Sequence, residues 1–406
     1  MRVALYYPWI YLTSGGERII AELTRRSRHE WLLFTSHYDP ESTFPELRSR
    51  GVVELNRVSV QRDMLSVARS AGSILRQKLP PRDYDAIFVL GEGLGDLILF
   101  RNHSRPVLGY CLTPLRAAFD PVYQAQAYAK RGLPGKLALS GGLALFRAID
   151  RLAWKHYSRL LFVSQEAVRR ARAGGLLGRH VPEVLYTGVG LSADRPSDTF
   201  DPFFLIPGRI MWTKNVQLGI RAFQEFQSAH PEYRNFRLWI AGVVDQKSRP
   251  YLEELRELTA GDPRIQFQLA PTDQELRRLY ETCYAVLFPP LNEDLGIVPI
   301  ESMAFGKPVI AVNQGGPRET IEHGAHGFLA SPAPREFAGL MAALAANPGI
   351  ARAMGRAGFR HARDFSWDHF VGRIDDLLEE MAPQNSGAGN PACRRLSDGV
   401  SKRGVA

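Results

Sequence analysis

Cysteine is scarce in this sequence of 406 residues, with only three copies. Cys111, Cys283 and Cys393 are an odd number at scattered spacings, which excludes a disulfide framework and a cysteine metal site and favours a reducing cytoplasm. Long apolar runs are also missing, so no membrane-spanning helix is expected. The first apolar run is broken by Pro8 and leads into a Gly-Gly loop, so it predicts a buried strand rather than a targeting signal.

Acidic residues are too few to balance the basic ones. The chain has 42 Asp and Glu against 51 Lys and Arg, a formal net charge of +9. This excess favours an acidic partner, namely nucleic acid, anionic lipid or a phosphorylated substrate. We expect no nucleic acid, because the basic residues are dispersed and no recognisable nucleic-acid-binding motif is present.

Short apolar runs alternate with helical patterns in both halves of the chain, from RVALYY to EVLYTGVG and again from FFLIPGR to PVIAV. This alternation predicts an α/β protein with two facing, Rossmann-like, doubly wound sheets and a cleft between the domains. The predicted boundaries are a first domain over 1–190, a linker over 191–201, a second domain over 202–366, a helix over 367–381 near the domain junction and a disordered tail over 382–406.

The segment FPPLNEDLGIVPIESMAFGKP, residues 288–308, carries two glutamates eight positions apart. Pro289 ends a predicted strand, and Pro299 suits the first position of a helix that Gly306 would end. Glu293 is then expected in the loop and Glu301 in the first helical turn. Amides at a helix start attract anions, so a phosphate and hydroxyl-binding carboxylates can lie side by side. Alternatively, both glutamates are ordinary solvated charges.

Two cations follow the first strand of the second half, in PGRIMWTKN. Arg209 comes directly after the strand and Gly208, and Lys214 stands near the next helix start. Two cations in this arrangement can bind a diphosphate and stabilise it as a leaving group. Either residue alone would more often be a surface charge.

Glycine pairs follow predicted strands at two places. Gly15 and Gly16 precede a helix, where the backbone can approach an anion. A second pair occurs in NQGGPRETIEHG, in which we expect Glu319 to be structural. The glycine-rich segment 91–96 lacks the dinucleotide-binding spacing, so no nicotinamide cofactor is inferred.

These segments together resemble glycosyltransferase family 4, whose members are retaining enzymes with the GT-B fold. The Glu-x7-Glu block, the Gly-Arg and Lys pair and the GGER loop carry the resemblance, which covers residues 1–381. It implies an N-terminal acceptor-side domain and a C-terminal nucleotide-sugar domain. It also implies that the donor is bound by Gly15, Gly16, Gly208, Arg209, Lys214, Glu293, Asp294, Leu295, Gly296, Ile297 and Glu301.

The resemblance assigns roles to some of these residues. Glu293 would face the transferred sugar and Glu301 would bind the nucleotide ribose. Arg209 and Lys214 would act with Glu293 in catalysis, by stabilising the leaving diphosphate. No metal ion or other cofactor is expected, and the nucleoside diphosphate sugar is the co-substrate.

The segment YCLTPLRAAFD, residues 110–120, is similar to a segment of mannosyltransferases of surface-polysaccharide assembly. Leu112 stands where those enzymes have histidine, so no histidine role is carried over. Thr113, Arg116 and Asp120 remain as acceptor-side or donor contacts, with a loop-anchoring role as the alternative. Cys111 is expected to be a buried small hydrophobe rather than a nucleophile.

A basic amphipathic stretch runs from Tyr128 to Arg159. It interleaves leucines with Lys130, Arg131, Lys136, Arg147, Arg151, Lys155 and Arg159. Such a face can lie on anionic lipid, so peripheral contact at the inner face of the membrane is one expectation. A solvated face over an apolar core stripe is the alternative.

The predicted function is transfer of a sugar, with a lean towards mannose, from a nucleoside diphosphate sugar to a glycan or lipid-linked saccharide. This is chemistry of cell-surface polysaccharide or glycoconjugate assembly. One alternative is a GT-B sugar-phosphate synthase or epimerase. Another is a non-catalytic nucleotide-sugar-binding subunit, which Leu112 keeps open.

Overall fold

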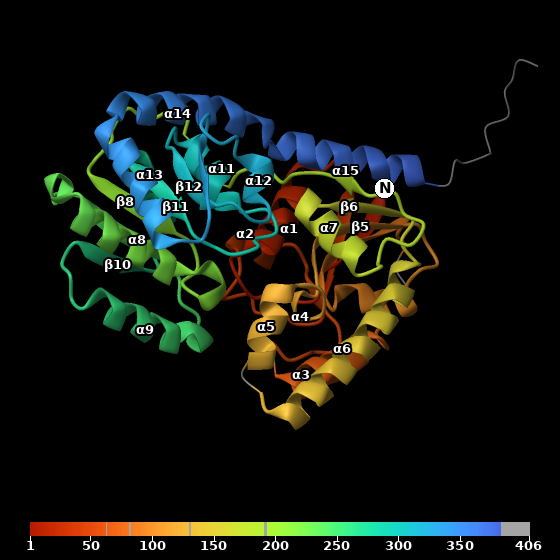
Figure 1. Ribbon diagram of the computed structural model, residues 1–406. Helices are drawn as coiled ribbons and strands as arrows, with labels where there is room; N and C mark the ends of the chain where they lie inside the picture. The colour runs from red at the N-terminus through yellow and green to blue at the C-terminus, as the bar shows by residue number, and fades with distance from the viewer. Residues whose placement is uncertain (62, 81–82, 130, 191–192, 383–406) are drawn as a thin grey trace, which may run out of the picture.

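The computed structural model describes residues 1–61, 63–80, 83–129, 131–190 and 193–382. Lys130, linker residues 191–192 and the predicted tail from residue 383 onwards lie outside the described residues. The described chain forms two α/β domains, each built on one parallel sheet (Figure 1). This confirms the predicted fold class.

The first sheet has seven parallel strands in the order β3-β2-β1-β4-β5-β6-β7. They are β1 (Arg2–Tyr6), β2 (Glu30–Thr35), β3 (Val53–Glu54), β4 (Ala86–Gly93), β5 (Val107–Pro114), β6 (Arg159–Phe162) and β7 (Glu183–Val184). The connecting elements are α1 (Gly15–Arg26), α2 (Pro45–Arg48), α3 (Met64–Ile74), the 3₁₀ helix η1 (Gly95–Phe100), α4 (Arg116–Phe119), α5 (Pro121–Ala129), α6 (Leu133–Trp154) and α7 (Gln165–Ala173). The strand order reverses between β1 and β4, which is where sheets of this kind bind ligands.

The second sheet has six parallel strands in the order β10-β9-β8-β11-β12-β13. They are β8 (Phe203–Pro207), β9 (Arg237–Gly242), β10 (Ile265–Leu269), β11 (Ala285–Phe288), β12 (Val309–Val312) and β13 (Gly327–Ala330). The α-helices are α8 (Val216–Ala229), α9 (Arg249–Thr259), α10 (Asp273–Thr282), α11 (Ile297–Ala304), α12 (Pro317–Thr320), α13 (Pro334–Ala346), α14 (Pro348–His361) and α15 (Trp367–Met381). Here the order reverses between β8 and β11, the strands that precede Arg209 and Glu293.

The central strands are buried on both faces, as a parallel sheet between helices requires. In β8, Phe203 and Leu205 pack into one hydrophobic cluster, whereas Phe204 and Ile206 pack into another. Successive side chains of a strand point to opposite faces, so the apolar run of β8 supplies both layers. This explains why the strand has no polar alternation.

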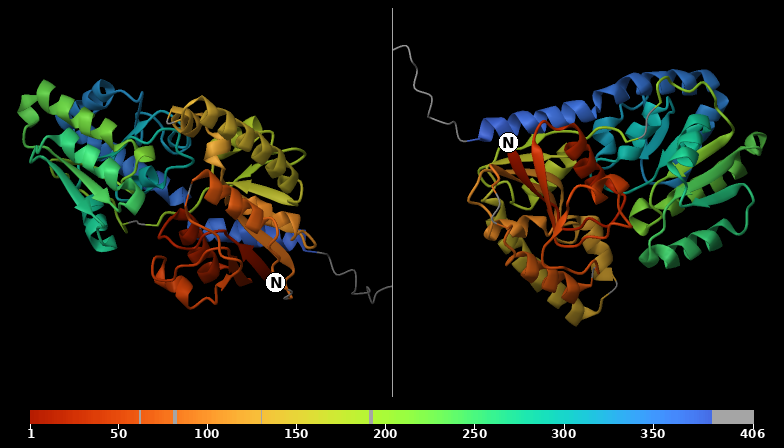
Figure 2. Two further views of the ribbon diagram at one scale, coloured as in Figure 1. Left: turned by 90° about the horizontal axis from the view of Figure 1, so that it is seen from below. Right: turned by 180° about the vertical axis from the view of Figure 1, so that it is seen from behind.

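The last helix returns to the first domain. Figures 1 and 2 show α14 over the second domain and α15 running on across the first one. Asp375 accepts hydrogen bonds from the Ser27 hydroxyl (2.6 Å) and the Arg28 amide (3.0 Å), and Arg373 pairs with Glu183 at 2.8 Å. A Cβ atom on Gly188 would lie 2.4 Å from the Trp367 ring, so only glycine permits this crossing.

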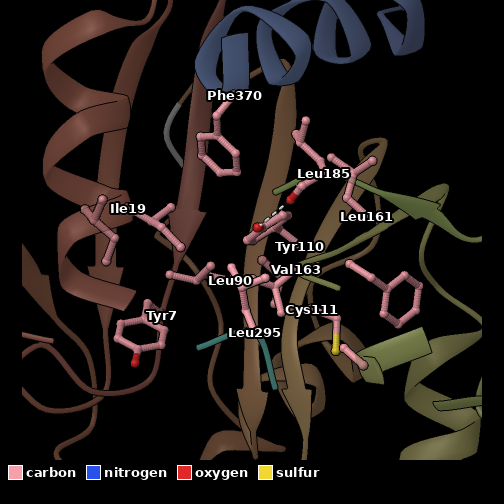
Figure 3. Packing of buried hydrophobic residues seen from close by; sticks show 14 of the residues in the cluster. Tyr7, Ile19, Leu90, Tyr110, Cys111, Leu161, Val163, Leu185, Leu295 and Phe370 are labelled. Atoms are coloured by element: carbon pink, nitrogen blue, oxygen red, sulfur yellow. Dashed lines mark hydrogen bonds between the residues drawn. The ribbon is translucent and has the colours of Figure 1, made fainter. Parts of the chain in front are cut away.

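One hydrophobic cluster continues from the first domain into the second. Leu295, from the loop after β11, is buried in the same cluster as Leu90, Cys111 and Val163 of the first domain (Figure 3). Tyr110 in this cluster donates a hydrogen bond to the Leu185 carbonyl (2.8 Å) and packs edge-on against Phe370 of α15. Burial of Leu295 therefore anchors the loop that carries Glu293 to the first domain.

Candidate active site

Glu293 lies in the loop between β11 and α11. Asn292 and Gly296 adopt φ angles of 51° and 79°, and Gly296 is the N-cap of α11, which begins at Ile297. The prediction that Pro299 begins the helix is therefore wrong by two residues, and Glu301 lies in the second turn rather than the first. Proline is tolerated at the third position because the first amides of a helix have no internal acceptor.

Glu293 is surrounded by cations from two other segments, the one after β8 and the start of α4. Its Oε2 lies 2.7 Å from Lys214 Nζ, and both side chains are largely buried. Burial alone raises the pKa of the Glu293 carboxyl, but Lys214, Arg116 and Arg209 outweigh it, so the pKa is lowered. Glu293 is therefore a carboxylate at neutral pH, and the structure brings the three predicted catalytic residues together.

Arg209 comes directly after a point where the backbone at Gly208 passes so close to Gly242 that only glycine fits. Gly208 has a φ angle of 119°, and a Cβ atom on Gly242 would lie 1.7 Å from the Gly208 carbonyl oxygen. The Gly208 amide donates to Ala241 O at 2.9 Å. The chain therefore turns sharply after β8 and leaves Arg209 exposed near Glu293. Gly242 was not predicted, because its partner is remote in sequence.

Glu301 lies at a separate place on α11, beside residues from both domains. Tyr280 donates a hydrogen bond to its Oε2 (2.9 Å), and Gly190 approaches Oε1 closely enough that a Cβ atom there would lie 3.7 Å away. Burial raises the pKa of Glu301 to about 7, although Tyr280 and the charge of Arg18 oppose the rise. Arg18 is the arginine of the GGER loop, so this loop reaches the second domain at Glu301.

The Gly15-Gly16 pair forms the start of α1. A Cβ atom on Gly16 would lie 2.6 Å from the Tyr7 hydroxyl, which donates to Glu92 at 2.6 Å, whereas Gly15 has open space around it. Glu17 is buried and accepts from the Leu12 amide (3.1 Å) and the Ser14 hydroxyl. Gly16 is thus needed for packing, and Gly15 is the member of the pair whose backbone is free to approach a ligand.

Arg116 and Asp120 join the first domain to the loop of Glu293. Arg116 pairs with Asp120 at 2.7 Å and donates to the carbonyl oxygen of Asn292 at 2.9 Å. The Asn292 side chain in turn donates to Asp120 at 3.1 Å. Both predicted residues are therefore loop anchors, and Arg116 also adds positive charge at Glu293.

Arg170 is a structural residue of this site that the sequence did not reveal. Its side chain is 1% exposed and lies 3.7 Å from Asp120, donates to Thr113 Oγ1 at 2.8 Å and pairs with Asp294. Thr113 and Asp294 are thereby held in an ion network between the domains rather than free for a ligand. The signal was present but weak: Arg170 follows Ala167 at helical spacing, on the buried face of α7.

The second glycine pair, Gly315 and Gly316, packs against the backbone of the loop that carries Glu293. A Cβ atom on Gly315 or Gly316 would lie 2.3 Å from the carbonyl oxygen of Glu293 or Leu295, respectively. The Gly316 amide donates to Glu293 O at 2.9 Å. These glycines therefore position the backbone of the loop.

Glu319 has the structural role that was expected, but at another helix. It accepts hydrogen bonds from the amides of Gln165 and Glu166, both 2.7 Å, at the start of α7. Its own helix, α12, is only four residues long. A carboxylate at the N-terminus of α7 is favoured by the helix dipole, and it fixes the helix that carries Arg170.

Other predicted positions make no further contribution to this site. Leu295 has its side chain in the hydrophobic cluster, so a donor could touch only its backbone. Burial raises the pKa of the Cys111 thiol well above its ordinary value, which suits a core residue and not a nucleophile. In the described parts of the chain, no group of three or more His, Cys, Asp or Glu is placed to hold a metal ion.

The sequence of the chain is similar to known glycosyl transferases. The family described as Glycosyl transferases group 1 matches residues 191–361. The alpha-1,3/1,6-mannosyltransferase ALG2 of Rhizomucor pusillus is 27% identical over 447 residues, covering 96% of this chain and 94% of the relative. Sucrose-phosphate synthase from Thermosynechococcus elongatus superposes with a TM-score of 0.70 at 18% identity, over 94% of this chain and 99% of the other. Anabaena Alr3699/HepE in complex with UDP gives 0.67 at 17% identity, over 94% and 100%.

Two facing parallel-sheet domains, with acidic and basic side chains converging where they meet, form the GT-B fold, which the chain shares with these solved structures. Residues 191–361 match the group 1 glycosyl transferases, and nearly the whole chain is similar to ALG2 of Rhizomucor pusillus. The prediction of a sugar-transferring enzyme that uses a nucleotide sugar is confirmed at this level.

Proposed function

We propose that the chain transfers mannose from a nucleoside diphosphate sugar to a glycan or lipid-linked saccharide, with retention of the anomeric configuration. One observation carries the proposal: Glu293 is a carboxylate surrounded by Lys214, Arg116 and Arg209 at the meeting point of the domains. This arrangement offers both a hydroxyl-binding anion for a sugar and cations for a diphosphate.

In the proposed reaction the bond between the anomeric carbon and the diphosphate oxygen breaks. The acceptor hydroxyl attacks that carbon from the same face, so the configuration is kept, and its proton passes to the leaving phosphate oxygen. Negative charge grows on the diphosphate as the bond breaks, and Lys214 and Arg209 stabilise it more in the transition state than in the bound donor. Lys214 would then exchange its contact with Glu293 for a contact with phosphate.

Glu301 and Arg18 would bind the nucleotide end. A carboxylate accepts hydrogen bonds from two ribose hydroxyls, and Glu301 is oriented for this by Tyr280. Arg18 lies on the first domain, so donor binding would use residues of both domains. Gly15, Gly296 and Ile297 would line the diphosphate with backbone amides at the starts of α1 and α11.

Mannose is favoured by the relationship to ALG2, whose name states α-1,3/1,6-mannosyl transfer. The UDP complex of Alr3699/HepE bears on the fold alone at 17% identity, so it does not choose the base. We further propose that the transfer needs no metal ion, because Lys214 and Arg209 supply the positive charge that a metal ion would otherwise supply. We also propose that the enzyme acts in the cytoplasm, peripheral at the inner face of the membrane.

The test is a thermal-shift panel of nucleotides and nucleotide sugars, followed by transfer assays with the donor that stabilises the protein. A ligand that binds only the native state raises the melting temperature by mass action. We expect a response to one nucleoside diphosphate family, and a product with the donor's anomeric configuration by NMR, in the presence of EDTA. Donor binding without transfer or hydrolysis would instead support a non-catalytic subunit, and an inverted product would remove the retaining mechanism.

A further inference from the structure

The helices α3 and α6 expose a large apolar surface away from the active site. Six of the ten large hydrophobic side chains that are exposed in the described chain belong to them. They are Met64 and Leu65 on α3, and Leu133, Leu137, Leu145 and Leu152 on α6. The two helices meet where Met64 approaches Gly142, so we treat these residues as one surface, the α3–α6 face.

The exposed apolar residues of α6 form a continuous stripe. Leu137, Gly141, Ala144, Ala148 and Leu152 follow one another at steps of three or four residues and are all exposed, while Leu139 and Leu143 on the opposite side are buried. A helix of 22 residues is about 33 Å long. The helix begins at Leu133, and its first turns carry two of its exposed leucines, Leu133 and Leu137.

The charges around this stripe are nearly all positive, the exception being the exposed Asp63 that caps α3. Between Pro121 and Tyr157 the only acidic residue is Asp150, which is fully buried, and none occurs between Met64 and Leu79. The exposed basic side chains of the α3–α6 face are Arg69, Arg76, Lys136, Arg151 and Lys155. Arg69 and Arg76 line a hollow of about 450 Å³ on α3 together with Asn56 and Ser73.

We propose that the α3–α6 face docks on a bilayer that contains anionic lipid, with its leucines in the acyl boundary and its basic residues among the headgroups. A helix with an apolar stripe flanked by lysine and arginine lies in the plane of such an interface. A second copy of this chain fits less well, because a two-fold contact would bring equal basic surfaces together. No helix in the described ranges is long and apolar enough to cross a membrane, so the contact is at the surface.

The face is joined to the active site by short connections. Arg147 of α6 donates to the carbonyl oxygen of Ala118 in α4 (2.8 Å), and α4 begins with Arg116. Tyr123 of α5 lies under the Arg116 guanidinium and packs against Trp212, beside Lys214. Figures 1 and 2 show α3 and α6 at the end of the first domain opposite α15. A docked enzyme would thus hold the Arg116 side of the site near the bilayer, where a lipid-linked acceptor lies.

Membrane docking would serve the proposed transfer to a lipid-linked acceptor, and in that respect it rests on the proposed function. The experiment that tests docking needs neither donor nor acceptor. Purified protein is sedimented with vesicles of phosphatidylcholine alone or with 30–40% phosphatidylglycerol, a range chosen as roughly that of an anionic membrane. We expect binding to the anionic vesicles that weakens as salt is raised from about 0.05 M to 0.5 M. No binding to anionic vesicles overturns the proposal.

Two triple variants separate the apolar and the electrostatic contributions. Leu137→Ser/Leu145→Ser/Leu152→Ser and Arg69→Glu/Lys136→Glu/Lys155→Glu should each weaken vesicle binding by about tenfold or more. The matched controls change residues exposed elsewhere, Val181→Ser/Leu269→Ser/Ile350→Ser and Arg221→Glu/Arg335→Glu/Arg356→Glu, and should bind as the wild type does. Equal losses in test and control variants would overturn the assignment of the face.

The melting temperature and the transfer activity of each variant distinguish loss of docking from loss of folding or of catalysis. Each variant is first checked for a wild-type melting temperature and for transfer to a soluble acceptor, which docking does not require. Normal transfer with lost vesicle binding supports the inference, and failed transfer with normal vesicle binding refutes the proposed function alone. A lipid-free dimer that the leucine variant dissociates would assign the face to a second copy and overturn the membrane proposal.

Discussion

Lys214 and Glu293 are 79 positions apart in the sequence and form an ion pair of 2.7 Å between Nζ and Oε2. The pair joins the segment after β8 to the loop after β11, the two strands between which the order of the second sheet reverses. Both partners are therefore placed by the sheet topology. The cation expected to bind the diphosphate and the anion expected to face the sugar neutralise each other in this structure, and the proposed reaction requires a donor to separate them.

Replacing Lys214 should mainly affect turnover. Lys214→Ala removes a cation that acts on charge developing in the transition state, so we expect kcat to fall by about 10²–10³ with a smaller change in KM. Steady-state kinetics with the donor found by thermal shift measures this. Arg221→Ala, exposed on α8, is the matched control and should leave both constants unchanged. An unchanged kcat in Lys214→Ala would remove the leaving-group role.

Donor binding should depend on pH through Glu301. Because burial raises the pKa of Glu301 to about 7, the carboxyl is mostly protonated at pH 6 and mostly ionised at pH 8. Only the ionised form accepts two ribose hydroxyl hydrogen bonds, so the dissociation constant of the donor should be about tenfold larger at pH 6 than at pH 8. Isothermal titration calorimetry across this range measures it. Glu301→Gln should bind weakly and lose the dependence, and a variant that keeps it would show that another group titrates.

Arg170 should be needed for the stability of the domain interface. Arg170→Met removes the fully buried cation between Asp120 and Asp294 and leaves Arg116 as their remaining partner, a change that costs up to about 3–5 kcal/mol. Arg169→Met is the control, because this neighbour is 64% exposed and its ion pair with Glu166 contributes at most about 1 kcal/mol. Thermal unfolding of the two variants should show a large shift for the first only. Equal melting temperatures would mean that the network is not a structural link.

Gly316 should be irreplaceable for the loop of Glu293. Gly316→Ala places a Cβ atom 2.3 Å from the Leu295 carbonyl oxygen, so the loop must move, and a displacement of about 1 Å at a reacting group can lower the rate by about 10². Gly339→Ala in α13 meets no atom within 4 Å and serves as the control. The measurement is kcat/KM together with the melting temperature. Full activity in Gly316→Ala would show that the loop tolerates the shift.

The sequence predicted the parts of the site that depend on local patterns. Strand endings located Arg209 and the loop of Glu293, because a parallel sheet brings the carboxyl ends of neighbouring strands together. It could not predict the partners that come from remote segments. Arg170, Gly242 and the capping role of Glu319 depend on contacts across more than 30 positions, up to 154, and no periodicity records such a contact. The start of α11 was also misplaced, since the left-handed conformation of Gly296 decided it rather than the proline.

The position of α15 has a consequence for how this protein is made. Its residues are the last of the described chain, yet Asp375 and Phe370 complete the packing around Ser27 and Tyr110 of the first domain. Domains generally fold in the order in which the ribosome releases them. Here the first domain emerges without one of its helices and keeps apolar surface uncovered while the whole second domain is synthesised. Translation that stops after α14 should therefore yield two sheets but an unfinished first domain, which is a target for chaperones.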